Sequence, residues 1–210
     1  LFGPNGAGKT TLMQILSSQM LPTSGKVYVS GIDTRYDREE IHRRIGVVTH
    51  DPYLYNNLSA SENLEFYAKM YDVPGQPEEI QQLLEQVGLS AYRNDAVHTF
   101  SRGMQQRLSI ARAVIHDPPV LLLDEPFTGL DQQGIDDLKK LLKGFQDQGK
   151  TIVMASHQLS LGAELCSHAA ILSSGRLVYK AHQSKINKDN FKQTYLKYAG
   201  ETLPPNRVSI

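Results

Sequence analysis

The chain has 210 residues, of which 40% are hydrophobic, and this is enough to bury a sizeable core in one domain or two closely joined lobes. Its formal net charge is zero, so charge gives no reason to expect nucleic acid or a bare anionic membrane as the main partner. No apolar run approaches the roughly 20 residues that span a bilayer, and no signal-peptide pattern is seen, so we expect any membrane role to come through a partner. The only cysteine, Cys166, has no second thiol to pair with, which favours a reducing compartment and a packing role for its side chain.

A glycine-rich motif runs from Gly3 to Thr10: a glycine, four residues, a glycine, a lysine and a threonine. In such a loop the glycines let backbone N–H groups approach phosphate oxygens, and the helix that follows adds its positive N-terminal end. Lys9 would place its charge on the outer phosphates, and the Thr10 hydroxyl can hold Mg²⁺. A phosphate loop normally follows a buried strand, and only Leu1 and Phe2 precede this one, so we expect an upstream segment to be missing.

The next part of the chain is predicted to alternate between helix and strand. Leu12 and Ile15 lie on the apolar face of a helix that follows the phosphate loop. A turn at 22–25 leads into a short alternating strand at 26–30. A second strand is expected at 45–49.

The middle of the chain is predicted to be helical. Ser59 and Glu62 have the spacing of a capping box, which opens a helix. Pro77 opens a second helix, and Gly88 ends it. We therefore expect a helical insertion over residues 51–112.

Strand patterns return after this insertion. The run 120–123 is continuously apolar, as in a strand buried on both faces. A helix is expected over 135–145, a further buried strand at 151–155, and a hairpin over 169–179.

The order of elements predicts an α/β fold, with a mostly parallel sheet and helices on its faces. We expect a core formed by residues 1–50 and 113–180, split by the helical subdomain at 51–112. Residues 181–210 are expected to add a small amphipathic helix and a disordered tail.

Polar side chains follow two of the predicted strands. Asp124 and Glu125 end the strand at 120–123, and His157 follows the strand at 151–155. At the C-terminal edge of an open α/β sheet, side chains face the ligand crevice. Asp124 can bind Mg²⁺ and Glu125 can polarise an attacking water, while His157 can hydrogen-bond a γ-phosphate and hold that carboxylate in place.

Another polar motif stands at the start of the helix that leads toward Asp124. Ser101 and Gly103 would place a hydroxyl and backbone N–H groups at the N-terminus of this helix, which is a suitable site for an anion. The motif also fits an ordinary helix cap. Its position shortly before the carboxylate pair favours the functional interpretation.

Together these motifs resemble the nucleotide-binding domain of an ABC transporter over roughly residues 1–180. The glycine-rich motif is similar to the Walker A loop, and 120–125 to Walker B with its catalytic glutamate. Residues 129–131 are similar to the D-loop, and 100–105 occupy the place of the Leu-Ser-Gly-Gly-Gln signature.

The resemblance implies the RecA-like fold of P-loop NTPases, with ATP and Mg²⁺ bound. It implies catalysis by Lys9, Glu125 and His157, and Mg²⁺ held by Thr10 and Asp124. The residues that it implies at the nucleotide are Gly3, Pro4, Asn5, Gly6, Ala7, Gly8, Lys9, Thr10, Thr11, His50, Ser101, Gly103 and Asp131.

The resemblance also implies partners. In that family two nucleotide-binding domains pair head to tail around two ATP molecules, and their closing and reopening moves the attached membrane subunits. We therefore expect the ATPase subunit of an exporter, peripheral to the cytoplasmic face of the cell membrane. Its expected partners are permease subunits and a second ATPase domain, with a homodimer favoured and no nucleic acid.

Three features depart from the family pattern. His50 stands where the family has the Q-loop glutamine, and an imidazole differs from an amide in reach and charge. In the signature, Arg102 and Met104 replace a glycine and the glutamine, while Ser101 and Gly103 remain. The aromatic residue that stacks on adenine in this family would lie upstream of the chain.

A finer resemblance concerns the cargo. The segments 50–55 and 101–107 are similar to those of the ATPase subunit of cytochrome c maturation haem exporters, so haem is the expected cargo. Drug- and polysaccharide-type exporters carry similar signatures. The aromatic cluster around Tyr53 and Tyr55 fits either the core of the helical part or a groove for a helix of the membrane partner.

Two other functional classes fit the residues less well. A soluble ABC ATPase acting on chromosomes would carry long coiled coils, and one acting on ribosomes usually has two cassettes and basic linkers; this sequence shows neither. A P-loop kinase or GTPase would need an acceptor lid or a guanine-reading Asn-Lys-x-Asp segment, and it would leave the signature unexplained.

Overall fold

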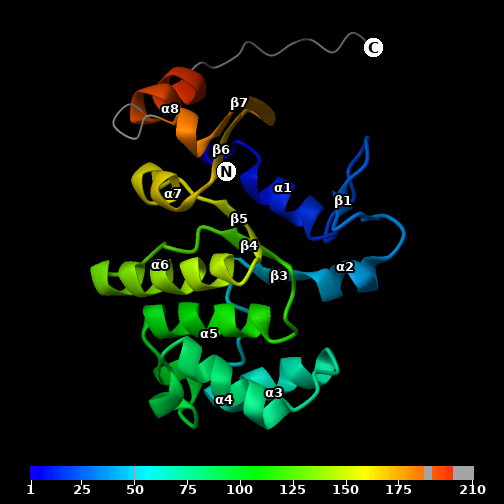
Figure 1. Cartoon of the computed structure of the whole chain (residues 1–210), viewed down its shortest axis with the longest axis vertical. Helices are drawn as coiled ribbons and strands as arrows, with labels where there is room; N and C mark the ends of the chain where they lie inside the picture. Colours follow the sequence, from blue (N-terminus) through cyan, green and yellow to red (C-terminus); the bar gives the residue numbers. More distant parts are fainter. Residues whose placement is uncertain (50, 187–190, 201–210) are drawn as a thin grey trace. The chain divides into compact units, whose positions relative to one another are not determined.

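The computed structural model describes residues 1–49, 51–186 and 191–200, and these residues form an α/β fold (Figure 1). His50 and the predicted tail at 201–210 lie outside the described residues. In chain order the elements are α1 (Lys9–Leu16), β1 (Tyr28–Val29), β2 (Ile32–Asp33), α2 (Arg38–Arg44), β3 (Ile45–Val48), α3 (Ala60–Met70), α4 (Gln76–Gln86), η1 (Ser90–Tyr92), η2 (Val97–Thr99), α5 (Arg102–Val114), β4 (Val120–Asp124), α6 (Gln132–Asp147), β5 (Thr151–Ala155), α7 (Leu159–Leu165), β6 (His168–Ser173), β7 (Arg176–His182), η3 (Gln183–Lys185) and α8 (Phe191–Gly200).

The chain divides into two compact units, and each is described by itself. The first unit combines Leu1–Met13 with Met154–Ile210, and the second is Gln14–Val153. The boundaries fall inside α1 and β5. This division does not coincide with the expected one into a core and a helical insertion at 51–112, which stays a prediction.

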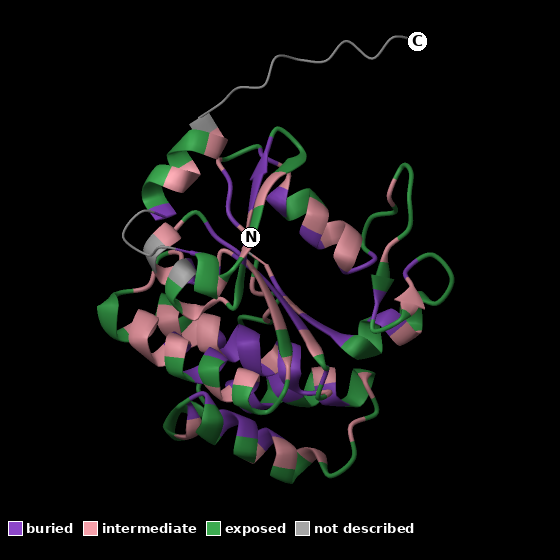
Figure 2. Cartoon of the chain, turned by 45° about the horizontal axis from the view of Figure 1, so that its top comes forward, coloured by how far each residue is buried: buried purple, intermediate pink, exposed green. Residues whose placement is uncertain are grey.

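The central strands of the second unit follow the apolar runs of the sequence. β3 and β4 pair in parallel, with Ile45 opposite Val120 and Val48 opposite Leu123, in a sheet of order β3-β4-β5. Leu121 and Leu123 are fully buried, as the continuous apolar run predicts for a strand covered on both faces. The buried residues, drawn purple in Figure 2, run along these strands and the helix faces turned toward them.

β3 approaches α5 so closely that one position requires glycine. A Cβ built on Gly46 would overlap the carbonyl oxygen of Ala113, near the end of α5. Because the glycine removes this clash, α5 packs directly against β3 and buries Leu108, Ile110 and Ala111.

The helices of the second unit begin where their caps predict. Ser59 Oγ accepts a hydrogen bond from the Glu62 N–H at 3.2 Å, and a Glu62 carboxylate oxygen accepts one from the Ser59 N–H at 2.7 Å. This is the predicted capping box, and it opens α3. α3, α4 and α5 pack against one another, which confirms the helical character expected for this part of the chain (Figure 1).

The first hairpin is shorter than the sequence predicts. The expected strand at 26–30 is reduced to Tyr28–Val29, because Ser30 and Gly31 both take positive φ angles and turn the chain back into β2. Sequence reasoning also missed α2, which buries only Ile41 and therefore carries little apolar periodicity. Its start is nevertheless marked by Asp37, whose side chain accepts a hydrogen bond from the Glu40 N–H at 2.9 Å.

In the first unit, residues 1–2 lie as a short extended segment between β5 and β6. The Phe2 N–H donates to Ala170 O and the Leu172 N–H to Phe2 O, both at 2.7 Å, in a parallel bridge with β6. On the other side, the Leu1 nitrogen donates to Met154 O at 2.6 Å and the Ser156 N–H to Leu1 O at 2.9 Å. The segment that leads into the glycine-rich motif is therefore held as a strand.

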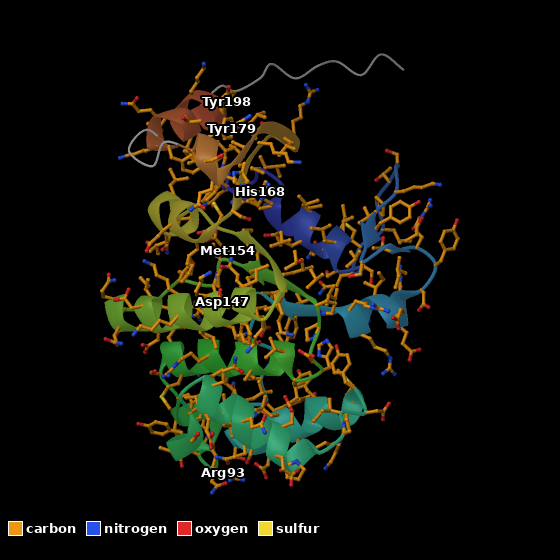
Figure 3. The ribbon with its side chains drawn as sticks, in the orientation of Figure 1. Arg93, Asp147, Met154, His168, Tyr179 and Tyr198 are labelled. Atoms are coloured by element: carbon orange, nitrogen blue, oxygen red, sulfur yellow. The ribbon has the colours of Figure 1, made fainter. Side chains whose placement is uncertain are left out.

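A hydrophobic core supports this segment. Phe2 packs with Ala169, Ile171 and Phe191, and the rings of Phe2 and Phe191 meet edge to face at 5.1 Å. β6 and β7 form the predicted antiparallel hairpin, and α8 covers β6. Figure 3 shows Tyr179 of β7 beside Tyr198 of α8; their ring centroids are 5.3 Å apart.

Cys166 is partly buried and packs at the margin of this core, which fits its predicted packing role. Across the residues that the structure describes, none of the helices combines the length and the apolar character needed to cross a membrane.

Candidate functional site

The glycine-rich motif forms a tight loop at the end of the segment held between β5 and β6. Gly3 is buried, and a Cβ at this position would overlap the carbonyl oxygen of Leu172, so only glycine lets the loop pass β6. The loop is closed by a hydrogen bond from the Ala7 N–H to Pro4 O at 3.2 Å, and it is tied to the β6–β7 turn by one from the Gly175 N–H to Ala7 O at 3.0 Å.

This loop offers hydrogen-bond donors for an anion. Within the described residues, the N–H groups of Asn5, Gly6 and Gly8 donate no hydrogen bond, and α1 begins directly afterwards at Lys9. Unpaired N–H groups at the start of a helix form a concavity that is suited to phosphate. The residues present therefore fit the phosphate groups of a nucleotide.

Lys9 is the buried cation of the loop, with a relative exposure of 7%. Its Nζ donates to Gly3 O at 2.8 Å and to Pro4 O at 3.2 Å, so the side chain folds back along the loop. A buried ammonium group that is held only by neutral carbonyl oxygens favours the arrival of an anion. Thr10 and Thr11, in the first turn of α1, are exposed.

His157 leaves β5 at the edge where the loop begins. The strand segments 1–2 and 154–156 run in parallel, so their C-terminal ends share one edge of the first unit. His157 is exposed there, directly after the buried Ser156. The first unit therefore brings the predicted histidine and the predicted phosphate loop to the same edge.

In the second unit, the predicted carboxylate pair ends β4. Asp124 is buried, with a relative exposure of 9%, while Glu125 is partly buried. Glu125 adopts a left-handed backbone conformation with φ of 54°, which is uncommon for a residue other than glycine. Strain of this kind concentrates at functional sites, and it turns the chain sharply from the buried strand toward Phe127.

The predicted signature residues lie at the N-terminus of α5. Ser101 is the exposed N-cap residue, and its Oγ accepts a hydrogen bond from the Met104 N–H at 3.3 Å. Because this contact uses only a lone pair of the hydroxyl, its proton stays available for an acceptor such as a phosphate oxygen. Gly103 lies in the first turn and is partly buried.

Asp131 has a structural role that the sequence pattern did not predict. It is the N-cap of α6, and its carboxylate accepts a hydrogen bond from the Gly134 N–H at 2.8 Å. Its side chain is exposed on the same unit as Ser101. The carboxylate therefore holds its own loop in shape and remains accessible to a partner.

The predicted site residues thus fall into two sets. The phosphate loop and His157 belong to the first unit, and the remaining described residues, Ser101, Gly103, Asp124, Glu125 and Asp131, belong to the second. His50 lies outside the described residues. In the described part of the chain, no three His, Cys, Asp or Glu side chains gather to hold a metal ion.

A cavity of about 290 Å³ in the second unit holds residues that sequence reasoning missed. Arg112 of α5 donates to Val47 O at 2.6 Å and lies 5.3 Å from the ring centroid of Tyr67. His116 stacks on Tyr71 with ring centroids 3.9 Å apart, and its Nε2 lies 3.1 Å from Ile45 O.

The aromatic cluster predicted near residue 53 borders this cavity. Tyr53 lines it and stays 51% exposed, and Tyr55 is 46% exposed and packs edge to face on Phe66. Both side chains therefore keep a surface open to solvent. Arg112 lies in the last turn of α5, and His116 lies just after this helix. The available signal in the sequence was a basic residue among the apolar residues of 108–115.

The chain is similar to known ATP-binding proteins of transporters. A family model described as "ABC transporter" matches residues 1–128. The ABC transporter ATP-binding protein NatA of Bacillus subtilis is 35% identical over 86% of this chain and 74% of its own length. The bacitracin transport ATP-binding protein BcrA of Bacillus licheniformis is 39% identical over 93% of this chain and 63% of its own length. The chain thus spans 63–74% of these two curated relatives.

A solved structure is similar to most of this chain. The ATP-binding cassette MJ0796, described as a dimer in a post-hydrolysis state bound to ADP and Pi, matches with a TM-score of 0.77 at 28% identity. The match covers 87% of this chain and 83% of that chain.

Proposed function

Because this chain belongs to the ABC transporter family, we propose that it binds and hydrolyses ATP as the nucleotide-binding part of an exporter. The observation that carries the proposal is the loop from Gly3 to Thr10, with its unpaired N–H groups and the buried ammonium of Lys9. The dimeric relative with bound ADP and Pi supports a nucleotide at this loop and a second domain as partner.

Each of the predicted site residues has a separate role in binding or hydrolysing ATP. Lys9 and the loop N–H groups bind the phosphates, and Glu125 orients and polarises the attacking water. His157 donates a hydrogen bond to the terminal phosphate. Ser101 and Gly103 would reach the nucleotide of a second subunit from the far side, so that an isolated monomer has an incomplete site.

Mg²⁺ is part of this proposal. The hydroxyl of Thr10 and the carboxylate of Asp124 are the hard oxygen ligands that this ion prefers, together with phosphate oxygens. When bound, the ion neutralises charge that develops on the phosphates during hydrolysis. The exposed position of Thr10 in the first turn of α1 and the position of Asp124 at the end of β4 fit this role.

The proposed partners are permease subunits in the membrane and a second copy of the ATPase, at the cytoplasmic face. The half-exposed rings of Tyr53 and Tyr55, beside the cavity of Arg112, support a docking surface for a helix of a permease subunit. The bacitracin relative is described as a transport ATP-binding protein, which agrees with this assignment.

For the cargo we propose haem, exported for cytochrome c biogenesis. The segments 50–55 and 101–107 support it by their resemblance to the ATPase subunit of haem exporters. A drug or peptide antibiotic is the competing cargo, favoured by the bacitracin relative. Vesicles that hold the complete transporter would separate the two. Transport of labelled haem that bacitracin does not inhibit would support haem as the cargo. Transport of bacitracin without transport of haem would support the competing cargo.

Light scattering tests the proposed mechanism. The Glu125→Gln chain should bind Mg-ATP without turning it over, because an amide cannot polarise the attacking water. We expect its molar mass to double when Mg-ATP is added and the unmodified chain to return to monomer as ATP is consumed. Near-normal hydrolysis by Glu125→Gln would remove Glu125 from its role. Glu78→Gln, at an exposed position in the first turn of α4, is the matched control.

A further inference from the structure

The side chain of Arg102 lies beside Gly129, although the two residues belong to different motifs. A Cβ built on Gly129 would stand 3.4 Å from Arg102 Nε, 3.6 Å from its Cγ and 3.9 Å from its Cδ. A side chain at position 129 would thus be in van der Waals contact with Arg102, so the stem of the arginine lies next to the open side of the glycine. Both residues belong to the second unit.

A second contact joins the same two segments. A Cβ built on Gly103 would stand 3.9 Å from Leu130 Cδ2, which brings the residue after Gly129 over the first turn of α5. Asp131 then caps α6. Residues 101–103 and 129–131 therefore form one continuous surface, called here the signature–loop surface.

This surface is open to solvent, and part of it has little internal support. Ser101, Arg102, Gly129 and Asp131 are all exposed. Gly129 has a φ of 77°, in the region that glycine enters freely, and the Leu130 N–H makes only a 3.3 Å hydrogen bond to Phe127 O. Without a cover, residues 129–131 would sample several conformations and would have to be ordered when a partner binds.

The Arg102 atoms nearest to Gly129 are those of the stem up to Nε, and not the terminal nitrogens of the guanidinium. Among the residues that the structure describes, none accepts a hydrogen bond from its guanidinium or forms an ion pair with it. The methylene groups of this stem would supply the packing, as long basic side chains commonly do along a surface.

We propose that Arg102 is a positioning residue, which holds residues 129–131 against the first turn of α5. Ser101 and Asp131 then meet the second subunit as one preformed surface. The inference rests on the proposed ATP-dependent pairing and assigns to Arg102 the preorganisation of its interface. Preorganisation lowers the entropic cost of pairing and leaves the reacting groups unchanged.

Steady-state hydrolysis of ATP by four variants tests this role. Arg102→Ala removes the stem, and we expect the ATP concentration for half-maximal rate to rise about fivefold, with the maximal rate changed less than twofold. Arg102→Lys keeps Cγ and Cδ, and Arg102→Met keeps Cγ and places its sulfur at the δ position, so both should restore the unmodified value. Arg38→Ala, at the exposed first position of α2, is the matched control and should change neither quantity.

The Met and Lys variants decide between stem and charge. If Arg102→Met behaves like Arg102→Ala while Arg102→Lys is normal, the charge contacts phosphate directly and the positioning role is overturned. A fall of the maximal rate in Arg102→Ala without a change in half-saturation overturns it as well.

Amide exchange separates this inference from the proposed function. In the monomer without nucleotide, exchange at the Leu130 N–H should be about tenfold faster in Arg102→Ala than in Arg102→Met. Equal exchange in the two variants contradicts the positioning role, even if ATP-dependent pairing occurs. Failure of the unmodified chain to hydrolyse ATP contradicts the proposed function, whatever the exchange rates show.

Discussion

Glu125 combines a chemical group with an unusual backbone. Its φ of 54° costs about 1 kcal/mol or more for a residue with a Cβ. β4 is buried up to Asp124, so the chain must leave the sheet abruptly at this point. A strained turn that presents a carboxylate at a strand end agrees with the role that we propose for Glu125.

Lys9 is the second residue on which the proposal depends. In Lys9→Ala the loop loses its buried ammonium, and we expect nucleotide affinity to fall at least about a hundredfold, which corresponds to about 2.7 kcal/mol. Binding of a fluorescent ATP analogue measures the loss.

Lys180→Ala, an exposed position on β7, is the control for the loss of a positive charge in the same unit. Equal affinities of Lys9→Ala and the unmodified chain would show that the nucleotide does not bind at this loop.

At the scale of the elements, α5 carries residues of three parts of the second unit: the predicted signature, the core and the aromatic cavity. Its N-terminus carries Ser101 and Arg102, its middle packs on β3, and its last turns carry Arg112 beside the aromatic cavity. Arg112 Nε has no hydrogen-bond partner in the described part of the chain, and burial lowers the pKa of this side chain. A helix with these contacts can link the proposed docking surface to the predicted signature residues.

His116, just after α5, makes stability depend on pH. Its Nε2 lies against Ile45 O and must carry the proton, so protonation would place a second N–H at the buried Nδ1, which has no acceptor among the described residues. Burial, together with the positive charges of Arg112 and Lys150, lowers the pKa of His116 to about 4, although contacts with the backbone of Ile45 and His42 oppose the shift.

The sign of the effect follows from proton binding. Between pH 6.5 and 4 the unfolded chain binds a proton at this position that the folded chain does not, so stability falls as the pH falls through this range. Between pH 7 and pH 4, the free energy of unfolding of the unmodified chain should fall by about 3 kcal/mol more than that of His116→Gln. Urea unfolding at a series of pH values measures this difference; His98→Gln, at an exposed position, is the control. Parallel pH curves for the unmodified chain and His116→Gln would contradict the prediction.

At the scale of the whole molecule, the described residues leave the signature exposed. In the proposed dimer, Ser101 would face the nucleotide of the partner. Ser101→Arg should therefore leave ATP binding to the monomer within about twofold, while the bulky charged side chain prevents ATP-dependent pairing.

Equilibrium binding and light scattering together measure the two quantities. The substitution also removes a helix cap worth about 1 kcal/mol, so thermal unfolding of Ser101→Arg should be compared with that of Ser101→Asn, which keeps a cap. A normal ATP-induced dimer of Ser101→Arg would show that the signature does not lie at the interface.

Local sequence patterns predicted much of the fold because each of them depends on near neighbours. The capping box of Ser59 and Glu62, the buried run at 120–123 and the hairpin after 169 all appear in the structure. α2 was missed because one buried side chain leaves no periodicity to detect. The family was predicted from the order of its motifs, and the comparisons confirm it.

The sequence by itself determined the phosphate loop, the carboxylate pair and the family, because these features are encoded by residue types at short and regular spacings. Only the tertiary structure decided that α5 packs closely on Gly46, that Arg102 lies beside Gly129, and that the Nδ1 atom of His116 is buried without an acceptor among the described residues. Each of these features depends on how segments far apart in the chain pack together, and no local sequence pattern encodes such packing.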